Sequence, residues 1–332
     1  MKLKRGSAVA ASALLLGGLA AAPGGPAIAT TTARTTTTAR TTTTARTTTT
    51  AGTATTAPTK TTAGAAATAA CGVTAGSITA AGDFAGTTAT ATTPPTATRG
   101  KGPHLFTPGI AKASSTWTTA LEVPAGSTST GLVVLNDTLY SAFYSDLSGA
   151  PPKGLKKIGS GWGNFITVEE SLWQKAPGST VTAGALYGLK GGSGDLYRWV
   201  KGHREVAIGF ASVKTMALIS ETQTYDTFLA NTRGGALYTI RIPRTSPMKP
   251  IVKQVRTSTW QKFESLVAEK CGTQSTLLTA IDKDTGTAFL YAVGHANGTA
   301  TVIKGLGQIP GMFKDPVYFL STAEGQPPLF GE

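Results

Sequence analysis

The stretch Ile158-Gly-Ser-Gly-Trp162-Gly-Asn-Phe165 decides the fold, because related stretches recur along the chain. Aligned on their last residues, the copies lie 48, 50 and 50 residues apart. An earlier copy, Ser115-Thr-Trp117-Thr-Thr-Ala120-Leu121, lies 45 residues before Trp162. Five copies at this spacing predict five structural repeats. The later copies are Ile208-Gly-Phe210-Ala-Ser-Val213, Val255-Arg-Thr-Ser-Thr-Trp260-Gln-Lys-Phe263 and Leu306-Gly-Gln-Ile-Pro310-Gly-Met-Phe313.

Pairs of leucine and an aromatic residue follow the same period. From Leu105 onward, short runs of apolar and aromatic residues alternate with Gly, Pro, Asn and Asp, a pattern that predicts β-strands and turns. No apolar period of 3.6 residues is sustained, and Phe263 to Lys270 is the only candidate helical turn. The pairs are Leu105-Phe106, Leu139-Tyr140, Leu196-Tyr197, Leu237-Tyr238, Leu290-Tyr291 and Leu329-Phe330.

An all-β repeat of this length predicts a five-bladed β-propeller over residues 105–332. One repeat has too few residues to bury its own apolar faces, so we expect its aromatic side chains to pack between neighbouring sheets. The last pair, Leu329-Phe330, predicts that both ends of the propeller share one sheet.

The first 104 residues have a different composition. Lys2, Lys4 and Arg5 precede a short apolar run and the sequence Ala27-Ile28-Ala29, which predicts a secretory signal peptide over residues 1–29. Residues 30–70 are almost entirely Thr and Ala, a composition that predicts a disordered linker with the character of a glycosylated stalk. Residues 71–104 are expected to form a transition segment, partly ordered, with one edge strand.

Charge and cysteine content agree with an exported protein, either free or associated with a cell wall. Seven of the 30 Lys and Arg residues precede residue 61 and all 17 Asp and Glu residues follow Cys71, which leaves a net charge of +6 after the linker. No basic run contains interleaved aromatics, so nucleic acid is not an expected partner. No membrane span is expected. The only two cysteines, Cys71 and Cys271, are predicted to form a disulfide.

The stretch around Trp162, followed by Leu186-Tyr187 and Asp195-Leu196-Tyr197, resembles the tachylectin-type lectins, whose repeats read "IGxGGWxxF…LY…LY". The resemblance covers roughly residues 105 to 330. It implies a five-bladed propeller that binds N-acetylated amino sugars, with one site per blade between adjacent sheets. Phe210 and Pro310 replace the tryptophan in two copies, and Lys153-Gly-Leu-Lys-Lys157 stands where the family has a segment resembling "DNWxxRA".

Sugar recognition requires an aromatic face together with polar groups that bind hydroxyls. Trp117, Trp162 with Asn164, and Trp260 with Gln261 are therefore candidate sugar-binding residues, and packing between blades is the alternative role for these tryptophans. Trp199 lies outside the repeat frame, beside Tyr197, and is a further candidate.

No catalytic or metal-binding motif is found in the sequence. The three histidines are isolated, and Asp282-Lys-Asp284-Thr-Gly286 suits a hairpin turn better than a calcium loop. We therefore expect a non-enzymatic lectin, without a cofactor or metal, that binds N-acetylated amino sugars or cell-wall glycans at sites between blades. Two alternatives stay open: a propeller that binds protein or wall polymer, and a propeller glycosidase or lyase. The sequence leaves the oligomeric state undetermined.

Overall fold

The computed structural model describes residues 70–122, 124–149, 151–176 and 179–332. Within these ranges the protein is all-β, with 21 strands and no α-helix. The predicted signal peptide and residues 30–69 of the predicted linker lie outside the described residues. In the described part of the chain, no helix has the length and apolar character needed to cross a membrane.

The strands form three four-stranded antiparallel sheets and one nine-stranded sheet. The nine-stranded sheet divides at the short parallel pairing of β21 with β5 into two antiparallel halves, so we number five units. Unit 1 combines β21 (Val317–Ala323) with β1 (Gly72–Ile78), β2 (Asp83–Thr90) and β3 (Thr96–His104). Unit 2 contains β5 (Trp117–Glu122), β6 (Gly126–Leu135), β7 (Thr138–Ser145) and β8 (Lys153–Ser160), and the short β4 (Ala111–Ser114) also pairs with β6. Unit 3 contains β9 (Phe165–Gln174), β10 (Thr182–Lys190), β11 (Leu196–Val200) and β12 (His203–Ala207). Unit 4 contains β13 (Val213–Glu221), β14 (Tyr225–Thr232), β15 (Leu237–Pro243) and β16 (Ile251–Arg256), and unit 5 contains β17 (Ser265–Cys271), β18 (Ser275–Asp282), β19 (Thr287–Val293) and β20 (Ile303–Ile309).

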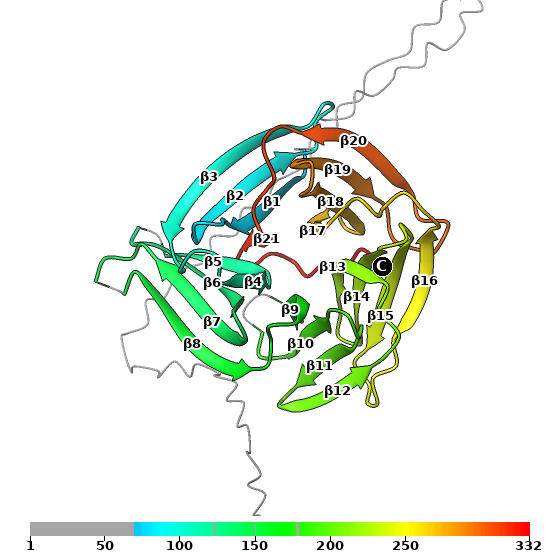
Figure 1. Cartoon of the computed structure of the whole chain (residues 1–332), viewed down its shortest axis with the longest axis horizontal. Helices are drawn as coiled ribbons and strands as arrows, with labels where there is room; N and C mark the ends of the chain where they lie inside the picture. The colour runs from blue at the N-terminus through cyan, green and yellow to red at the C-terminus, as the bar shows by residue number, and fades with distance from the viewer. Residues whose placement is uncertain (1–69, 123, 150, 177–178) are drawn as a thin grey trace, which may run out of the picture. The chain divides into compact units, whose positions relative to one another are not determined.

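The units follow one another around a common centre (Figure 1). Their first strands contact each other in sequence, from β4 to β9, β13, β17 and β21, and β21 contacts β4 again. The outermost strands are β3, β8, β12, β16 and β20 (Figure 1). Five apolar clusters fill the spaces between successive units, and each cluster takes residues from two neighbouring units. This arrangement is consistent with propeller-like blades, which bury their faces only against one another.

Strands from both ends of the described chain share unit 1. Strand β21 pairs antiparallel with β1 over Val317 to Leu320, and a short parallel pairing joins β21 to β5. The sharing of a sheet was predicted from Leu329-Phe330, but that pair forms no strand. Leu329 joins the cluster between units 3 and 4, and Phe330 makes a single bridge to Ser220 of β13.

Residues 71–104 differ from the expected transition segment, because they supply three complete strands. Small and β-branched residues dominate here, and a strand needs no large apolar residue when another sheet covers it. Gly76 lies directly beneath the ring of Phe319, where a Cβ atom would collide with the ring. The Thr, Ala and Gly composition that suggested a loop therefore belongs to a strand packed closely under an aromatic ring.

One backbone hydrogen bond repeats in all five units and corrects the sequence alignment. After the fourth strand, the N–H of an aromatic residue donates to a carbonyl in the turn between the second and third strands of the same unit, at 3.0–3.1 Å. By this criterion the first copy of the motif is centred on Phe106, whereas Trp117 lies within β5, and Phe313 rather than Pro310 corresponds to Trp162. The five donor–acceptor pairs are Phe106–Gly82, Trp162–Asp137, Phe210–Gly194, Trp260–Gly235 and Phe313–Gly286.

The candidate helical turn over Phe263 to Lys270 is wrong. This stretch contains most of β17, which pairs with β18 from Ser265 to Cys271. Leu266 and Ala268 face the cluster between units 4 and 5, whereas Val267 faces the cluster between units 5 and 1. Because both faces of the strand are buried, its sequence lacks the alternation that identifies a half-exposed strand.

Candidate functional site

An aromatic cluster lies on the face of unit 3 that packs against unit 2. It consists of Trp162, Phe165, Tyr197 and Trp199. The ring centroids of Trp162 and Trp199 are 4.9 Å apart, and the rings of Tyr197 and Trp199 stack at 5.5 Å with 19° between their planes. Trp162 is 7% exposed, whereas Tyr197 and Trp199 are half-buried. The tyrosine and second tryptophan therefore present the accessible part of this aromatic surface.

The short hairpin of β11 and β12 positions the rings of Tyr197 and Trp199. Tyr197 and Trp199 alternate along β11, so both side chains point to the same face of the sheet. The turn to β12 contains Lys201 and Gly202, both with positive φ, which suits a two-residue hairpin. This register pairs Trp199 with Arg204, whose guanidinium lies 5.8 Å from the centroid of the Tyr197 ring.

Polar groups adjoin the aromatic surface. Arg204 is exposed, and the partly exposed Asp195 accepts a hydrogen bond from the Ser193 hydroxyl at 2.9 Å. The Tyr197 hydroxyl lies 3.5 Å from the same Asp195 oxygen. A carboxylate, a phenol and a guanidinium beside a stacked aromatic pair are groups that can bind sugar hydroxyls and the apolar face of a sugar ring.

The remaining predicted sugar-binding residues lie elsewhere. Trp117 is 0% exposed, packs against Phe84 and donates its Nε1–H to Ser114 Oγ at 2.8 Å, so its ring has no surface on which a sugar could stack. Trp260 is 5% exposed and packs on Tyr291 at 5.0 Å. Asn164 and Gln261 are exposed in the connections that follow Trp162 and Trp260. The structure brings together only Trp162 and Trp199 from the predicted set, with Asn164 two residues from Trp162.

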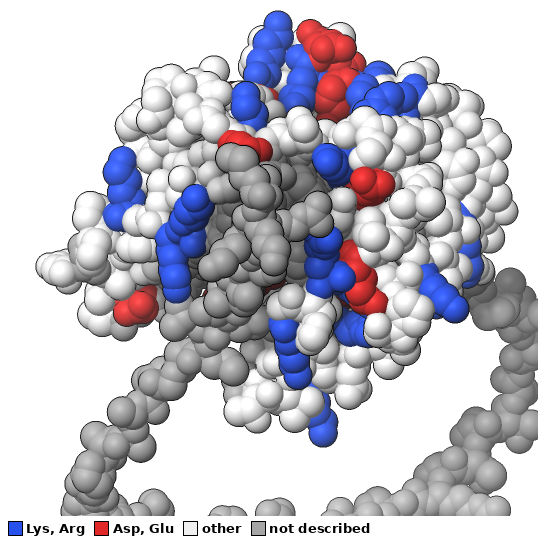
Figure 2. Space-filling view, turned by 60° about the horizontal axis from the view of Figure 1, so that its bottom comes forward, with Lys and Arg blue, Asp and Glu red and all other residues white. Residues whose placement is uncertain are grey.

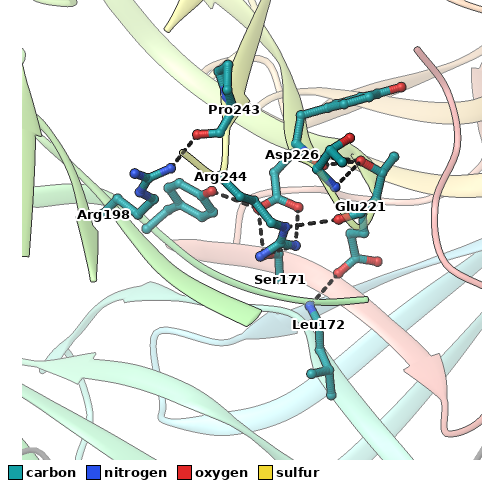
Figure 3. Close-up of polar contacts among 11 residues, drawn as sticks. Ser171, Leu172, Arg198, Glu221, Asp226, Pro243 and Arg244 are labelled. Atoms are coloured by element: carbon teal, nitrogen blue, oxygen red, sulfur yellow. Dashed lines mark hydrogen bonds and ion pairs between the residues drawn. The ribbon is translucent and has the colours of Figure 1, made fainter. Parts of the chain in front are cut away.

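On its opposite face, β11 is fixed by a buried polar network between units 3 and 4. Arg198 is 1% exposed and donates to the carbonyl of Pro243 (Figure 3). It also forms an ion pair with Glu205 and donates to the carbonyl of Thr245. Such charge-assisted hydrogen bonds are stronger than neutral ones. Because Arg198 lies between Tyr197 and Trp199 in sequence, its contacts hold the strand that presents the aromatic pair.

Asp226 is the centre of a second part of this network. Its buried carboxylate accepts from the Tyr187 hydroxyl at 2.7 Å, from Ser171 Oγ at 2.9 Å and from Arg244 at 2.7 Å (Figure 3). Burial raises the pKa of Asp226, and the charge of Arg244 opposes that shift. Every partner connects unit 3 to unit 4 or lies within unit 4, so this carboxylate has a structural role.

A cavity at the common centre is lined by the first strands of the units and contains further carboxylates. Glu169 accepts from the backbone N–H of Thr116 at 2.9 Å and from that of Glu170 at 3.0 Å, and burial raises its pKa to about 7. Glu264 forms an ion pair with Lys214 and accepts from the backbone N–H of Lys283 at 2.7 Å. These contacts tie neighbouring strands together and account for both cavity carboxylates.

The predicted disulfide is confirmed. Cys71, directly before β1, is bonded to Cys271 at the end of β17, with a Cα–Cα distance of 5.6 Å. The bond joins units 1 and 5, which also meet through β21 and an apolar cluster. A disulfide of this kind fits an oxidising, extracellular compartment.

Sequence analysis did not identify Tyr197, Asp195 and Arg204 as site residues. Their signal was present in the segment Asp195-Leu-Tyr-Arg-Trp-Val-Lys-Gly-His-Arg204, where a Lys-Gly turn fixes which residues face each other. The sequence does not indicate that unit 2 packs over Trp162 and leaves Tyr197 and Trp199 partly accessible.

Comparisons with known proteins do not assign the chain to a family. Protein-family profiles and the sequences of curated proteins give no match. A solved structure described as "Structure of SapL1 lectin in complex with alpha methyl fucoside" aligns with a TM-score of 0.36 and 8% identity, over 71% of this chain and 96% of that chain. A likeness this weak indicates neither a family nor a function for the chain.

Proposed function

We propose that this protein is a secreted five-bladed β-propeller lectin that binds an N-acetylated amino sugar on the aromatic cluster of unit 3. The observation that carries the proposal is the stacked, half-buried pair of Tyr197 and Trp199, with Arg204 and Asp195 beside it. A sugar ring would stack on Trp199, while Asp195 and Arg204 bind its hydroxyl or acetamido groups. The motif resemblance to tachylectin-type lectins supports the choice of sugar.

We propose a sugar site in unit 3 alone, whereas the motif resemblance implies one site in every blade. The residues that correspond to Trp199, two positions after the tyrosine of each Leu-Tyr pair, are Ala142, Ile240 and Val293 in units 2, 4 and 5. These side chains are buried and offer no aromatic surface. We therefore expect one sugar per chain among the units that carry a Leu-Tyr pair.

A glycan array followed by titration with N-acetylglucosamine tests the proposal. Binding should change the intrinsic tryptophan fluorescence, and calorimetry should give a stoichiometry near one. The variant Trp199→Ala should bind about tenfold more weakly or worse, since it loses the stacking surface. Trp173→Ala is the matched control, because Trp173 is a half-buried tryptophan of the same sheet, on β9, outside the cluster.

Two outcomes would refute this function. One is an array without binding to any amino sugar, which would favour the alternative that the protein binds protein or wall polymer. The other is an equal loss of affinity in the Trp173 and Trp199 variants, which would show that the cluster has no special role.

A further inference from the structure

Charge is distributed unevenly between the inner and outer strands of the units. The five outermost strands carry nine Lys and Arg residues and one carboxylate residue, Glu205, which is already paired with Arg198. The inner strands β5, β9, β13 and β17 carry five glutamates and two lysines. Lys and Arg side chains stand out over the face shown in Figure 2, with fewer Asp and Glu between them. The outer surface is therefore more basic than the net charge indicates.

The basic residues are densest where units 1 and 2 meet. The basic rim, as we define it, consists of Lys101 on β3 and of Lys153, Lys156 and Lys157 on β8, all exposed. Lys153 and Lys157 share one face of this edge strand, and Lys156 lies on its other face. Lys153 Nζ donates to the carbonyl of His104 at 2.8 Å, so the start of β8 meets the end of β3. Across residues 70–332, apart from the four that the structure does not describe, the six ion pairs include none of these lysines.

The carboxylates close to the basic rim have other partners. Asp83 contacts His104 Nδ1 at 2.8 Å. Asp146, in the connection leading to β8, accepts from the backbone N–H and the hydroxyl of Ser127, and these hydrogen bonds lower its pKa. The lysines of the rim are thus adjacent positive charges that lack a counter-charge from within the described protein.

Apolar surface alternates with these charges. Leu155 is 49% exposed and Ile158 46% exposed, and both lie on β8 among the lysines. Tyr140 and Tyr144, both half-buried, pair opposite Lys157 and Lys153. An extended strand places Lys153 and Lys157 about 13 Å apart on one face. A polymer that alternates sugar rings with negative charges matches such a surface along its length.

We propose that the basic rim binds a linear polyanionic glycan, whose repeat carries phosphate or carboxylate groups. A glycan is favoured over nucleic acid because the disulfide places the protein in an oxidising compartment. Lysines on an edge strand also discourage pairing with other strands, but that role requires no clustering across two units. This binding is separate from the sugar site of unit 3 and depends on charge, so it weakens steeply with salt.

The full-length secreted protein can be tested against four probes: inorganic polyphosphate, polygalacturonate, neutral dextran and duplex DNA. Binding to polyphosphate or to polygalacturonate, with no binding to dextran, is expected, and the stronger of the two identifies the anionic group. Tighter binding to DNA than to both polyanions would overturn the assignment to a glycan. Absence of binding to either polyanion at low salt would overturn the proposal itself.

A charge-matched pair of variants localises the site. The triple variant Lys153→Gln, Lys156→Gln, Lys157→Gln should bind the preferred polyanion on the order of tenfold more weakly or worse, with a salt dependence reduced by about two to three contacts. The control triple Lys175→Gln, Lys249→Gln, Lys314→Gln removes the same charge from exposed positions in three other connections. An equal loss in both would mean that only net charge matters and would refute the rim.

Two further measurements keep this result independent of folding and of the lectin proposal. If the β8 triple variant aggregates, Lys157→Gln alone carries the test with a smaller loss of affinity. Trp199→Ala should leave polyanion binding unchanged, so failure of the sugar site and failure of the basic rim can be told apart. A loss of polyanion binding in the Trp199 variant would contradict two separate surfaces.

Discussion

Removing the disulfide between Cys71 and Cys271 is expected to destabilise the protein substantially. The two cysteines are 200 residues apart in sequence, so the bond closes most of the described chain into one loop. In the chain-entropy treatment, closing a loop of this length costs the unfolded state about 5 kcal/mol at 25 °C. Measured effects of disulfides are usually about 2–4 kcal/mol, and we expect a loss of about 2–5 kcal/mol for this one.

The double variant Cys71→Ser, Cys271→Ser is the cleanest perturbation, since it leaves no free thiol. Urea unfolding, followed by tryptophan fluorescence, should show its midpoint lowered by about 1 M, given an unfolding slope of about 3 kcal/mol/M for a chain of this size. Wild-type protein reduced with dithiothreitol should unfold at the same midpoint as the double variant. Dithiothreitol should have no effect on the double variant, which is the control for the reagent itself.

A midpoint of the double variant equal to that of the wild-type protein would refute this role of the disulfide. That result would mean that β21 and the cluster between units 5 and 1 hold the ends together even in the unfolded ensemble, so that the bond restricts little. A change in slope without a change in midpoint would also count against the entropic argument, because it would report altered compactness of the unfolded state.

Three further predictions follow from individual contacts. Glu169→Gln should remove a pH dependence of stability, because the pKa of this carboxyl is raised to about 7 from an ordinary 4.5, so that its contribution to stability is complete below about pH 4.5 and lost as the pH rises to 7. In chemical unfolding, the free energy of unfolding of the variant should exceed that of the wild type by about 1–3 kcal/mol between pH 5 and 8. Parallel curves of stability against pH for the two proteins would contradict this. Gly194→Ala should lower the free energy of unfolding by more than about 2 kcal/mol, because φ is +68° and the new Cβ would collide with the backbone of Ala211. The control Gly192→Ala, where φ is +79° and the space is open, should lower it by only about 1 kcal/mol. Equal shifts of the thermal midpoint in the two variants would show that the collision with Ala211 has no effect. Tyr187→Phe should lower the free energy of unfolding by about 1.5–3 kcal/mol, since the buried Asp226 loses a hydrogen-bond donor. The control is Tyr197→Phe, because the Tyr197 hydroxyl lies 3.5 Å from Asp195, and this variant should change the free energy of unfolding by less than about 0.5 kcal/mol.

Local features of the fold could be predicted from the sequence. The Leu-Tyr pairs at Leu139, Leu196, Leu237 and Leu290 each lie in the third strand of a unit, as the repeat predicted. Period, turn residues and strand-forming residues act over a few neighbouring positions, so they can be read without knowledge of the rest of the chain. The cysteine pairing was predictable for a simpler reason, since only one pair exists.

Tertiary structure decided the features that depend on distant partners. Strands β1 to β3 are stable because β21, more than 200 residues later, pairs with β1 and because Phe319 covers Gly76. Trp117 and Trp199 are both tryptophans on strands, yet one is sealed between units 1 and 2 and the other is partly accessible beside unit 2. Burial of a side chain is set by the sheet that lies opposite, and this sheet comes from another part of the sequence. The repeat thus determined which residues form strands, whereas the packing of unit against unit determined which aromatic rings remain available to a ligand.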